Sequence, residues 1–244
     1  MLSSTSVVTP HPAHLELETW NPPENAEAAS QPDGRVDARG ANWSGCALGP
    51  ADLSGAKLCR TDLRGTDLSG SNLEDADLRL ARYDTSTRWP DGFDPCGCGA
   101  VGPGARLSGV FLNSTDLRGM DLRGAVLMGT YLSGADLSGA VLDGVRLAGA
   151  DLRRTVMRGA SCVGTRFGNA QLDFADLRGA QLQDAQLDNV ESIRGADFSA
   201  AVGLESIRAQ LLGREAHELD CWNPLTRSTT RESLSEDSVG SAMN

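Results

Sequence analysis

The residues of this chain that could do chemistry are few and lie far apart. The three histidines, His11, His14 and His217, all fall in the terminal segments, so the regular body of the chain offers no histidine as a general base. The sequence contains no G-x-S-x-G nucleophile motif, no phosphate-binding G-x-x-x-x-G-K loop and no dinucleotide-binding G-x-G-x-x-G motif. Most aspartates recur at one position of a repeat, which favours a structural role. The sequence therefore predicts a protein that is not an enzyme.

Six cysteines are scattered along the chain, and only Cys96 and Cys98 lie close together. A structural zinc site uses four ligands in two pairs, and no second cysteine or histidine pair completes this one. We therefore expect no metal and no cofactor, while the role of Cys96 and Cys98 stays open. The sequence shows no export signal and no apolar run of the roughly 20 residues that span a membrane. These features predict a cytoplasmic protein with reduced thiols and no membrane partner.

The element that must position the remaining side chains is a five-residue repeat. Large apolar residues, mostly Leu, occur at every fifth position from Trp43 to Tyr83 and again from Leu107 to Leu187. We call each of them a centre. The residue two before each centre is small, with Met120 as the exception, and a Gly commonly follows two after the centre. In extended backbone the centre and the small residue face one interior, and the residue between them, often Asp or Asn, faces water. The Gly then turns the chain, so each unit is a short extended side with a corner.

This pattern resembles the pentapeptide-repeat family, whose unit is written A(D/N)LxX, over about two-thirds of the chain. The resemblance implies an all-β fold, a right-handed quadrilateral β-solenoid with about 20 residues per coil. Residues 84–104 break the pattern and resemble a loop insertion of cyanobacterial members of the family. Their Pro and Gly content predicts a loop, which we expect Trp89 and Phe93 to anchor on a face of the solenoid. Partner binding by the loop is the alternative.

Four parts of the chain follow from this pattern. Residues 1–40 are interpreted as a partly disordered N-terminal segment and residues 41–203 as the solenoid. Residues 204–225 contain a short helix that caps the last coil, because apolar residues from Leu204 to Leu212 follow a helical spacing that stops at Gly213. Residues 226–244 are polar and are predicted to form a disordered tail.

A heptapeptide occurs twice, near the two ends of the chain. Residues 16–22 read Glu-Leu-Glu-Thr-Trp-Asn-Pro and residues 218–224 read Glu-Leu-Asp-Cys-Trp-Asn-Pro, with five identities. We interpret Trp20 and Trp222 as docking elements. Two alternatives stay open, namely that each Trp packs against the solenoid or its cap, and that the pair supports a homodimer.

The outer faces of the solenoid offer one candidate binding patch. With four sides per coil, residues 20 apart stack in one column, so Arg106, Arg146 and Arg166 share a column. The next column begins with Phe111 and Tyr131. Aromatic and arginine side chains are enriched at the energetic centres of protein interfaces, so these five residues are predicted to bind a protein partner. Cover by another segment of the same chain is the alternative. A further column of Asp residues followed by Arg is interpreted as a solvated face.

These features favour a non-enzymatic protein–protein interaction scaffold, a regulatory adaptor with an unidentified protein partner. The resemblance implies one alternative, a DNA-mimicking protein that binds gyrase and protects it from quinolones. The formal net charge is −11, but residues 41–203 hold 16 basic and 20 acidic groups, so most of the excess lies in the terminal parts. A phosphate mimic needs its negative charge on the solenoid, so the scaffold is preferred. The acidity also argues against direct nucleic-acid binding.

Overall fold

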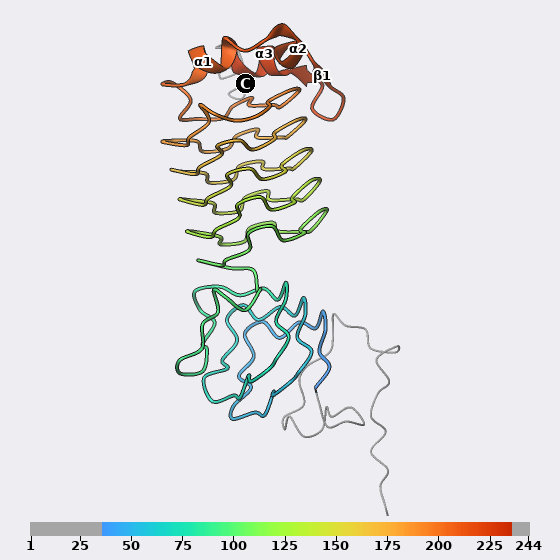
Figure 1. Cartoon of the computed structure of the whole chain (residues 1–244), viewed down its shortest axis with the longest axis vertical. Coiled ribbons are helices and arrows are strands. Elements are labelled where there is room, and N and C mark those ends of the chain that lie inside the picture. Colours follow the sequence, from blue (N-terminus) through green and yellow to red (C-terminus); the bar gives the residue numbers. More distant parts are fainter. Residues whose placement is uncertain (1–35, 236–244) are drawn as a thin grey trace, which may run out of the picture. The chain divides into compact units, whose positions relative to one another are not determined.

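The computed structural model describes residues 36–235, which form two compact units, one ending at Val101 and the other beginning at Gly102. In each unit, isolated parallel bridges join an outward residue to the one 20 positions later, as in Asp37 with Lys57 and Arg106 with Val126. These bridges recur every five residues, so one coil takes 20 residues and carries four bridge positions. The coils of the second unit are seen stacked on one another in Figure 1. The five-residue period of the sequence is therefore the period of a β-solenoid.

Each bridge is held by two backbone hydrogen bonds, and each corner by a third. Leu107 N–H donates to the carbonyl of Val126 at 2.9 Å, and Val126 N–H donates to the carbonyl of Ala105 at 2.9 Å. Val110 N–H closes the corner by donating to the carbonyl of Leu107 at 3.1 Å. The residue two after the centre has positive φ, 70° at Gly109, which explains the preference for Gly at this position.

The interior of each unit is lined by the centres and by the small residues two before them. In the second unit, centres such as Leu132 and Leu142 have no exposed surface, and neither have small residues such as Ala140. Burying one leucine side chain contributes about 1.5–3 kcal/mol. A threonine at the small position keeps its hydroxyl satisfied, since Thr130 Oγ1 donates to the carbonyl of Leu107 one coil back at 2.9 Å.

The first unit extends beyond two boundaries that the sequence predicted. It begins before residue 41, because Asp37 already pairs with Lys57 and Val36 is buried. The predicted loop 84–104 is also too long. Arg88 forms a bridge with Asp67, and Val101 forms one with Arg82, so both ends of that range still belong to coils. The six-residue step from Tyr83 to Trp89 shifts the phase by one residue and hides this continuation from a count by fives.

The coils of the second unit are followed by short helices and one hairpin. In chain order these are α1 (Arg208–Leu212), α2 (Ala216–Leu219), β1 (Trp222–Asn223), β2 (Ser228–Thr229) and α3 (Thr230–Leu234), with β1 and β2 antiparallel. Figure 1 shows them at the C-terminal end of the coil stack of this unit. α1 covers the second half of the helix predicted over residues 204–213 and ends at Leu212, with Gly213 as its C-cap.

The prediction of a disordered tail from residue 226 is wrong as far as residue 235. Thr229 and Glu232 form a capping box that starts α3, in which each side chain accepts a hydrogen bond from the backbone N–H of the other. Leu234, at the end of this helix, is buried. A capping box of this kind stabilises even a short helix, because it satisfies backbone donors that the first turn leaves without partners.

Candidate protein-binding face

Phe111 and Tyr131, two of the predicted contact residues, form one exposed aromatic stack. They are partners in a parallel bridge on consecutive coils, and their ring centroids lie 4.5 Å apart with planes inclined by 8°. Phe111 is 68% exposed and Tyr131 is 42% exposed. Met128, in the same coil as Tyr131, is a further exposed apolar side chain at 44%. Met128 is not among the contact residues predicted from the sequence, although its place between the outward positions Val126 and Tyr131 is a signal that could have identified it.

The arginines of the neighbouring column point outward, as the outward position of the repeat requires. Val126 forms bridges with both Arg106 and Arg146, and Arg146 forms one with Arg166, so the column is continuous over four coils. All three arginines are exposed. We call Arg106, Phe111, Tyr131, Arg146 and Arg166 the arginine–aromatic face. The structure thus brings the five predicted contact residues onto adjoining columns of one unit.

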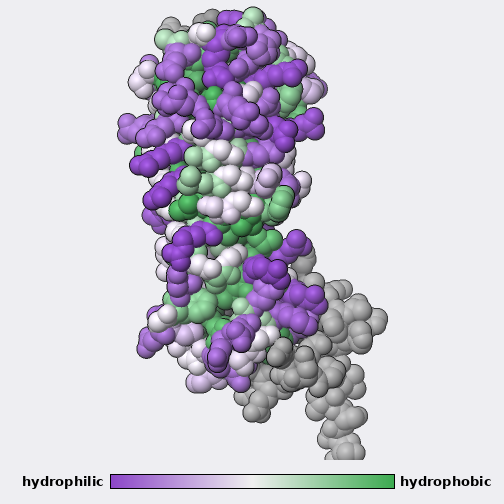
Figure 2. All heavy atoms as spheres, in the orientation of Figure 1, coloured by the Kyte–Doolittle hydropathy of each residue, from purple (hydrophilic) through white to green (hydrophobic). Residues whose placement is uncertain are grey.

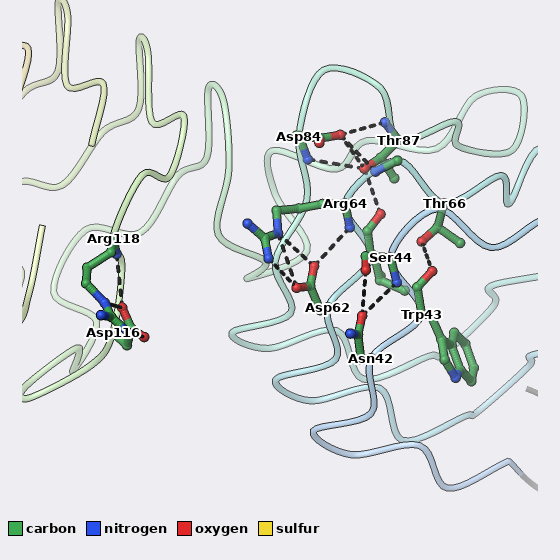
Figure 3. A network of polar contacts seen from close by, with 12 residues as sticks. Asn42, Trp43, Ser44, Asp62, Arg64, Thr66, Asp84, Thr87, Asp116 and Arg118 are labelled. Carbon is green, nitrogen blue, oxygen red and sulfur yellow. Dashed lines mark hydrogen bonds and ion pairs between the residues drawn. The ribbon is translucent and has the colours of Figure 1, made fainter. Parts of the chain in front are cut away.

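Seven arginines elsewhere in the repeat are neutralised by the Asp two residues before them. Arg118 donates through Nε and Nη2 to the two carboxylate oxygens of Asp116, at 2.9 and 2.8 Å. Figure 3 shows this fork and the equivalent pair of Arg64 with Asp62 in the first unit. The same arrangement recurs wherever an Arg stands two residues after an outward Asp, as in the pairs Asp37–Arg39, Asp77–Arg79, Asp121–Arg123, Asp151–Arg153 and Asp176–Arg178.

The forks hold their carboxylates in the charged form. Hydrogen bonds from Arg123 are the main reason that the pKa of Asp121 lies below its ordinary value. At Asp176, burial alone would raise the pKa, but hydrogen bonds from Arg178 and Arg158 outweigh it and lower the pKa. A carboxylate paired in this way is a poor imitation of a free phosphate, because its charge is already matched at close range.

Arg146 and Arg166 differ from the forked arginines in their position within the repeat. They occupy the outward position that Asp fills in the forks, so no Asp stands two residues before them. Within residues 36–235, neither guanidinium makes an ion pair with a carboxylate. Two like charges on consecutive coils, about 4.8 Å apart along the backbone, repel each other. An anionic group placed between them would relieve this repulsion.

Trp89 and Phe93, predicted as loop anchors, pack against the core of the first unit. Their rings stack at 5.0 Å, and Trp89 meets the buried Tyr83 edge-on at 5.6 Å. Cys98 lies against the same core and donates its Sγ–H to the carbonyl of Pro95 at 3.1 Å. Burial raises the pKa of this thiol, which keeps it protonated at neutral pH.

The C-terminal heptapeptide is divided between inward and outward side chains. Glu218 accepts a hydrogen bond from the backbone N–H of Ile193 at 3.1 Å, and Asn223 donates its amide to the carbonyl of Gly195 at 2.8 Å. Leu219 is fully buried, whereas Trp222 is 55% exposed. The heptapeptide therefore binds the last coil through Glu218 and Asn223, buries Leu219, and leaves Trp222 on the surface. Trp20, its predicted counterpart, lies outside the described residues.

The described residues also bear on metal and membrane binding. Among residues 36–235, no group of three or more His, Cys, Asp and Glu side chains is arranged to hold a metal ion. No helix in that same range is long and apolar enough to cross a membrane. Figure 2 shows one face of the molecule, where hydrophilic side chains predominate over the C-terminal elements and a paler, more apolar area lies over the coils before them.

Comparisons with known proteins place the repeat in a family. The model for pentapeptide repeats matches in eight copies, over residues 51–82, 104–139, 135–172, 156–191 and 166–202. No curated protein matches the chain. Among solved structures, a pentapeptide repeat protein from the Arabidopsis thaliana thylakoid lumen is 30% identical, with 59% of this chain and 95% of that chain covered and a TM-score of 0.39.

Two other solved structures are similar over a larger share of this chain. HetL, a pentapeptide repeat protein involved in heterocyst differentiation regulation in the cyanobacterium Nostoc, is 25% identical, with 70% and 90% of the two chains covered and a TM-score of 0.26. QnrB1, a plasmid-mediated fluoroquinolone resistance protein, is 21% identical, with 72% and 92% covered and a TM-score of 0.30. Because the family model matches more than half of the residues, the chain belongs to the pentapeptide repeat family, whose members fold as right-handed β-solenoids.

Proposed function

We propose that this protein is a non-catalytic scaffold that binds a protein partner through its arginine–aromatic face. The observation that carries the proposal is the exposed stack of Phe111 and Tyr131 beside the unneutralised pair of Arg146 and Arg166. Exposing two aromatic rings to water is unfavourable. Covering them with a partner therefore contributes favourably to the free energy of binding. Aromatic and arginine residues are also the types that dominate binding energy at interfaces.

The β-solenoid supports this role by holding the face rigid. Each outward side is fixed by backbone hydrogen bonds to the coils before and after it. Val126 N–H donates to the carbonyl of Ala105 in the preceding coil, and Leu127 N–H donates to the carbonyl of Arg146 in the following one. A surface fixed before binding loses little conformational entropy when the partner arrives. We further infer a four-sided coil, in line with the four bridge positions per 20 residues, and a cap on the last coil formed by α1 and the residues that follow it.

The chemistry of the face favours an acidic partner. The charge of Arg146 and Arg166 is available because neither belongs to an Asp–Arg fork. A carboxylate placed between two guanidinium groups makes charge-assisted hydrogen bonds, which are stronger than neutral ones. The apolar stack alongside would anchor an apolar or aromatic side chain of the same partner.

The DNA-mimic alternative calls for the opposite surface. A gyrase-binding solenoid would present unpaired carboxylates at phosphate-like spacing, whereas outward aspartates such as Asp116, Asp121 and Asp151 are each clamped by their own arginine. QnrB1 is a fluoroquinolone resistance protein, and its similarity to this chain concerns the fold. The forks therefore weigh against mimicry as the function of this chain.

The test is a capture experiment with three immobilised proteins and lysate of the native host. They are the wild type, the variant Phe111→Ala/Tyr131→Ala/Arg146→Glu, and the matched control Val202→Ala/Leu225→Ala/Arg123→Glu, which changes two exposed apolar residues and one arginine elsewhere. We expect a protein that the wild type and the control retain and the face variant loses, and that binds the purified wild type in calorimetry. Gyrase retained equally by all three proteins would contradict the proposal and support mimicry.

A further inference from the structure

The two copies of the heptapeptide differ in the arginines that accompany their acidic residues in the sequence. In the C-terminal copy, Glu218 pairs with Arg214, four residues before it, and Asp220 pairs with Arg231, eleven residues after it. The N-terminal copy keeps both acids, as Glu16 and Glu18, but not the two arginines. The corresponding positions are occupied by Pro12 and Ala29.

The N-terminal copy therefore carries two carboxylates and a tryptophan without the local partners of its counterpart. Residues 1–35 as a whole hold five acidic groups and one basic group. The arginine–aromatic face holds the complementary set, two arginines without an ion pair in residues 36–235 and two exposed stacked rings. Opposite charge and matching apolar surface in one polypeptide indicate that the segment and the face are ligand and receptor.

We propose that the arginine–aromatic face binds the segment Glu16–Trp20 of a second copy of this chain. The inference rests on the proposed function of the face and identifies a partner for it. Binding between copies places no length requirement on residues 21–35, which join the segment to the first coil. The contact is heterologous, since a segment of one copy meets a different surface of the next.

The spacing of the two partners agrees in an extended conformation. Alternate residues of an extended chain face one side at steps of about 6.7 Å, so Trp20, Glu18 and Glu16 would lie at about 0, 7 and 13 Å. Coils repeat at about 4.8 Å. Measured from the midpoint of the Phe111–Tyr131 stack, Arg146 and Arg166 lie about one and a quarter and two and a quarter coils further on, at about 6 and 11 Å along the coil stack. Trp20 over the rings therefore brings each glutamate level with one arginine.

The test is photo-crosslinking from position 20 in the full-length chain. Trp20→p-benzoylphenylalanine is introduced into ¹⁵N-labelled protein, which is mixed with unlabelled protein and irradiated, and cross-linked peptides are identified by mass spectrometry. We expect pairs of mixed isotope composition that join position 20 to peptides containing Phe111 or Tyr131. Glu16→Arg/Glu18→Arg and Arg146→Glu/Arg166→Glu should each reduce the yield at least tenfold, and the two double variants mixed together should restore it.

Matched controls separate this contact from general charge effects. Glu24→Arg/Glu27→Arg and Arg118→Glu/Arg123→Glu change the charge equally and should keep the cross-links, and circular dichroism checks that each variant is folded. Cross-links to other surfaces, pairs of a single isotope composition without any mixed pairs, or yields indifferent to charge reversal at Arg146 and Arg166 would overturn the inference. If the proposed function alone is correct, captured partner still depends on the face while these cross-links are absent. If the face binds nothing, both signals are absent.

Discussion

The ring of Phe111 lies flat against the ring of Tyr131 on the next coil, with centroids 4.5 Å apart and planes only 8° from parallel. The geometry of the ladder produces this stack. The two residues are bridge partners, coils repeat at about 4.8 Å, and two outward rings in one column at that spacing have room only to lie face to face. Both rings remain exposed, so their mutual contact does not remove the apolar surface from water. In the proposed function, a protein partner covers this surface.

Truncating a buried centre should lower the free energy of unfolding strongly, whereas truncating an exposed apolar residue should not. Leu142→Ala removes a side chain with no exposed surface and leaves a cavity between coils, so we expect a loss of about 2–5 kcal/mol in the free energy of unfolding. Leu225→Ala, at a residue 70% exposed, should change it by less than about 0.5 kcal/mol. Urea unfolding followed by circular dichroism measures both. Equal effects of the two substitutions would contradict the placement of the core.

Two glycines of positive φ should differ sharply when replaced. A Cβ at Gly139, where φ is 65°, meets nothing within 4 Å, so Gly139→Ala should cost about 1–2 kcal/mol of backbone strain. A Cβ at Gly203, where φ is 83°, would lie 2.4 Å from the backbone nitrogen of Gln183. Backbone cannot move aside as a side chain can, so Gly203→Ala should lower the melting temperature considerably more than Gly139→Ala. Similar melting temperatures would show that the last coils are spaced differently.

The heptapeptide should stabilise the last coil through Asn223 and not through Trp222. The Asn223 amide is buried, donates to Gly195 and accepts from the backbone N–H of Leu225. Asn223→Ala leaves these buried groups without partners, which costs about 1–3 kcal/mol. Trp222→Ala removes an exposed side chain and should cost less. Thermal unfolding of the two variants ranks them, and the reverse order would contradict the inward role of Asn223.

The fork at Asp176 should make stability depend on acid pH. The pKa of Asp176 is lowered below 3.8 in the folded protein, because hydrogen bonds from Arg178 and Arg158 outweigh the effect of burial. A lowered folded pKa gives stability that is complete above the unfolded value and is lost as the pH falls through the folded value. Asp176→Asn should therefore be less stable than the wild type at pH 7, and the difference should shrink below about pH 3.8.

Urea unfolding from pH 7 to pH 2.5 gives this difference directly. Glu205→Gln, at an exposed residue that makes no ion pair in the described part of the chain, serves as the matched control and should follow the wild type throughout. A difference between Asp176→Asn and wild type that stays constant across this range would show that the charge of Asp176 does not contribute through the two arginines.

The repeat made the fold predictable, because its period alone assigns each residue to the interior, the surface or a corner. The positions of Phe111 and Tyr131 on one column follow from that assignment, and so do the outward arginines. What the period could not provide are features that depart from it. The shift of one residue before Trp89 made a continuing coil look like loop, and α3 lies in a polar segment whose order depends on contacts with the last coil. Thr230 shows this, since its hydroxyl donates to the carbonyl of Ile193 at 3.1 Å.

The sequence alone only partly predicts the difference between the arginines of the Asp–Arg forks and the outward Arg146 and Arg166. Asp followed two residues later by Arg could be read as a solvated ion pair, but the two-pronged geometry of Asp116 with Arg118 appears only in the structure. The same holds for Glu218, which the sequence marks only as part of a duplication. Its hydrogen bond to Ile193 depends on how the chain returns to the last coil.

The most direct measurement of the central claim starts from the face itself. Phe111→p-benzoylphenylalanine is placed in the full chain, which is irradiated in lysate of the native host, with Leu225→p-benzoylphenylalanine as an equally exposed control. The account predicts a discrete covalent adduct with a protein from position 111 alone, which weakens with added salt and disappears when Arg146→Glu/Arg166→Glu is combined with it. The absence of any adduct from position 111, or an adduct that forms equally from position 225 or without the two arginines, would contradict it.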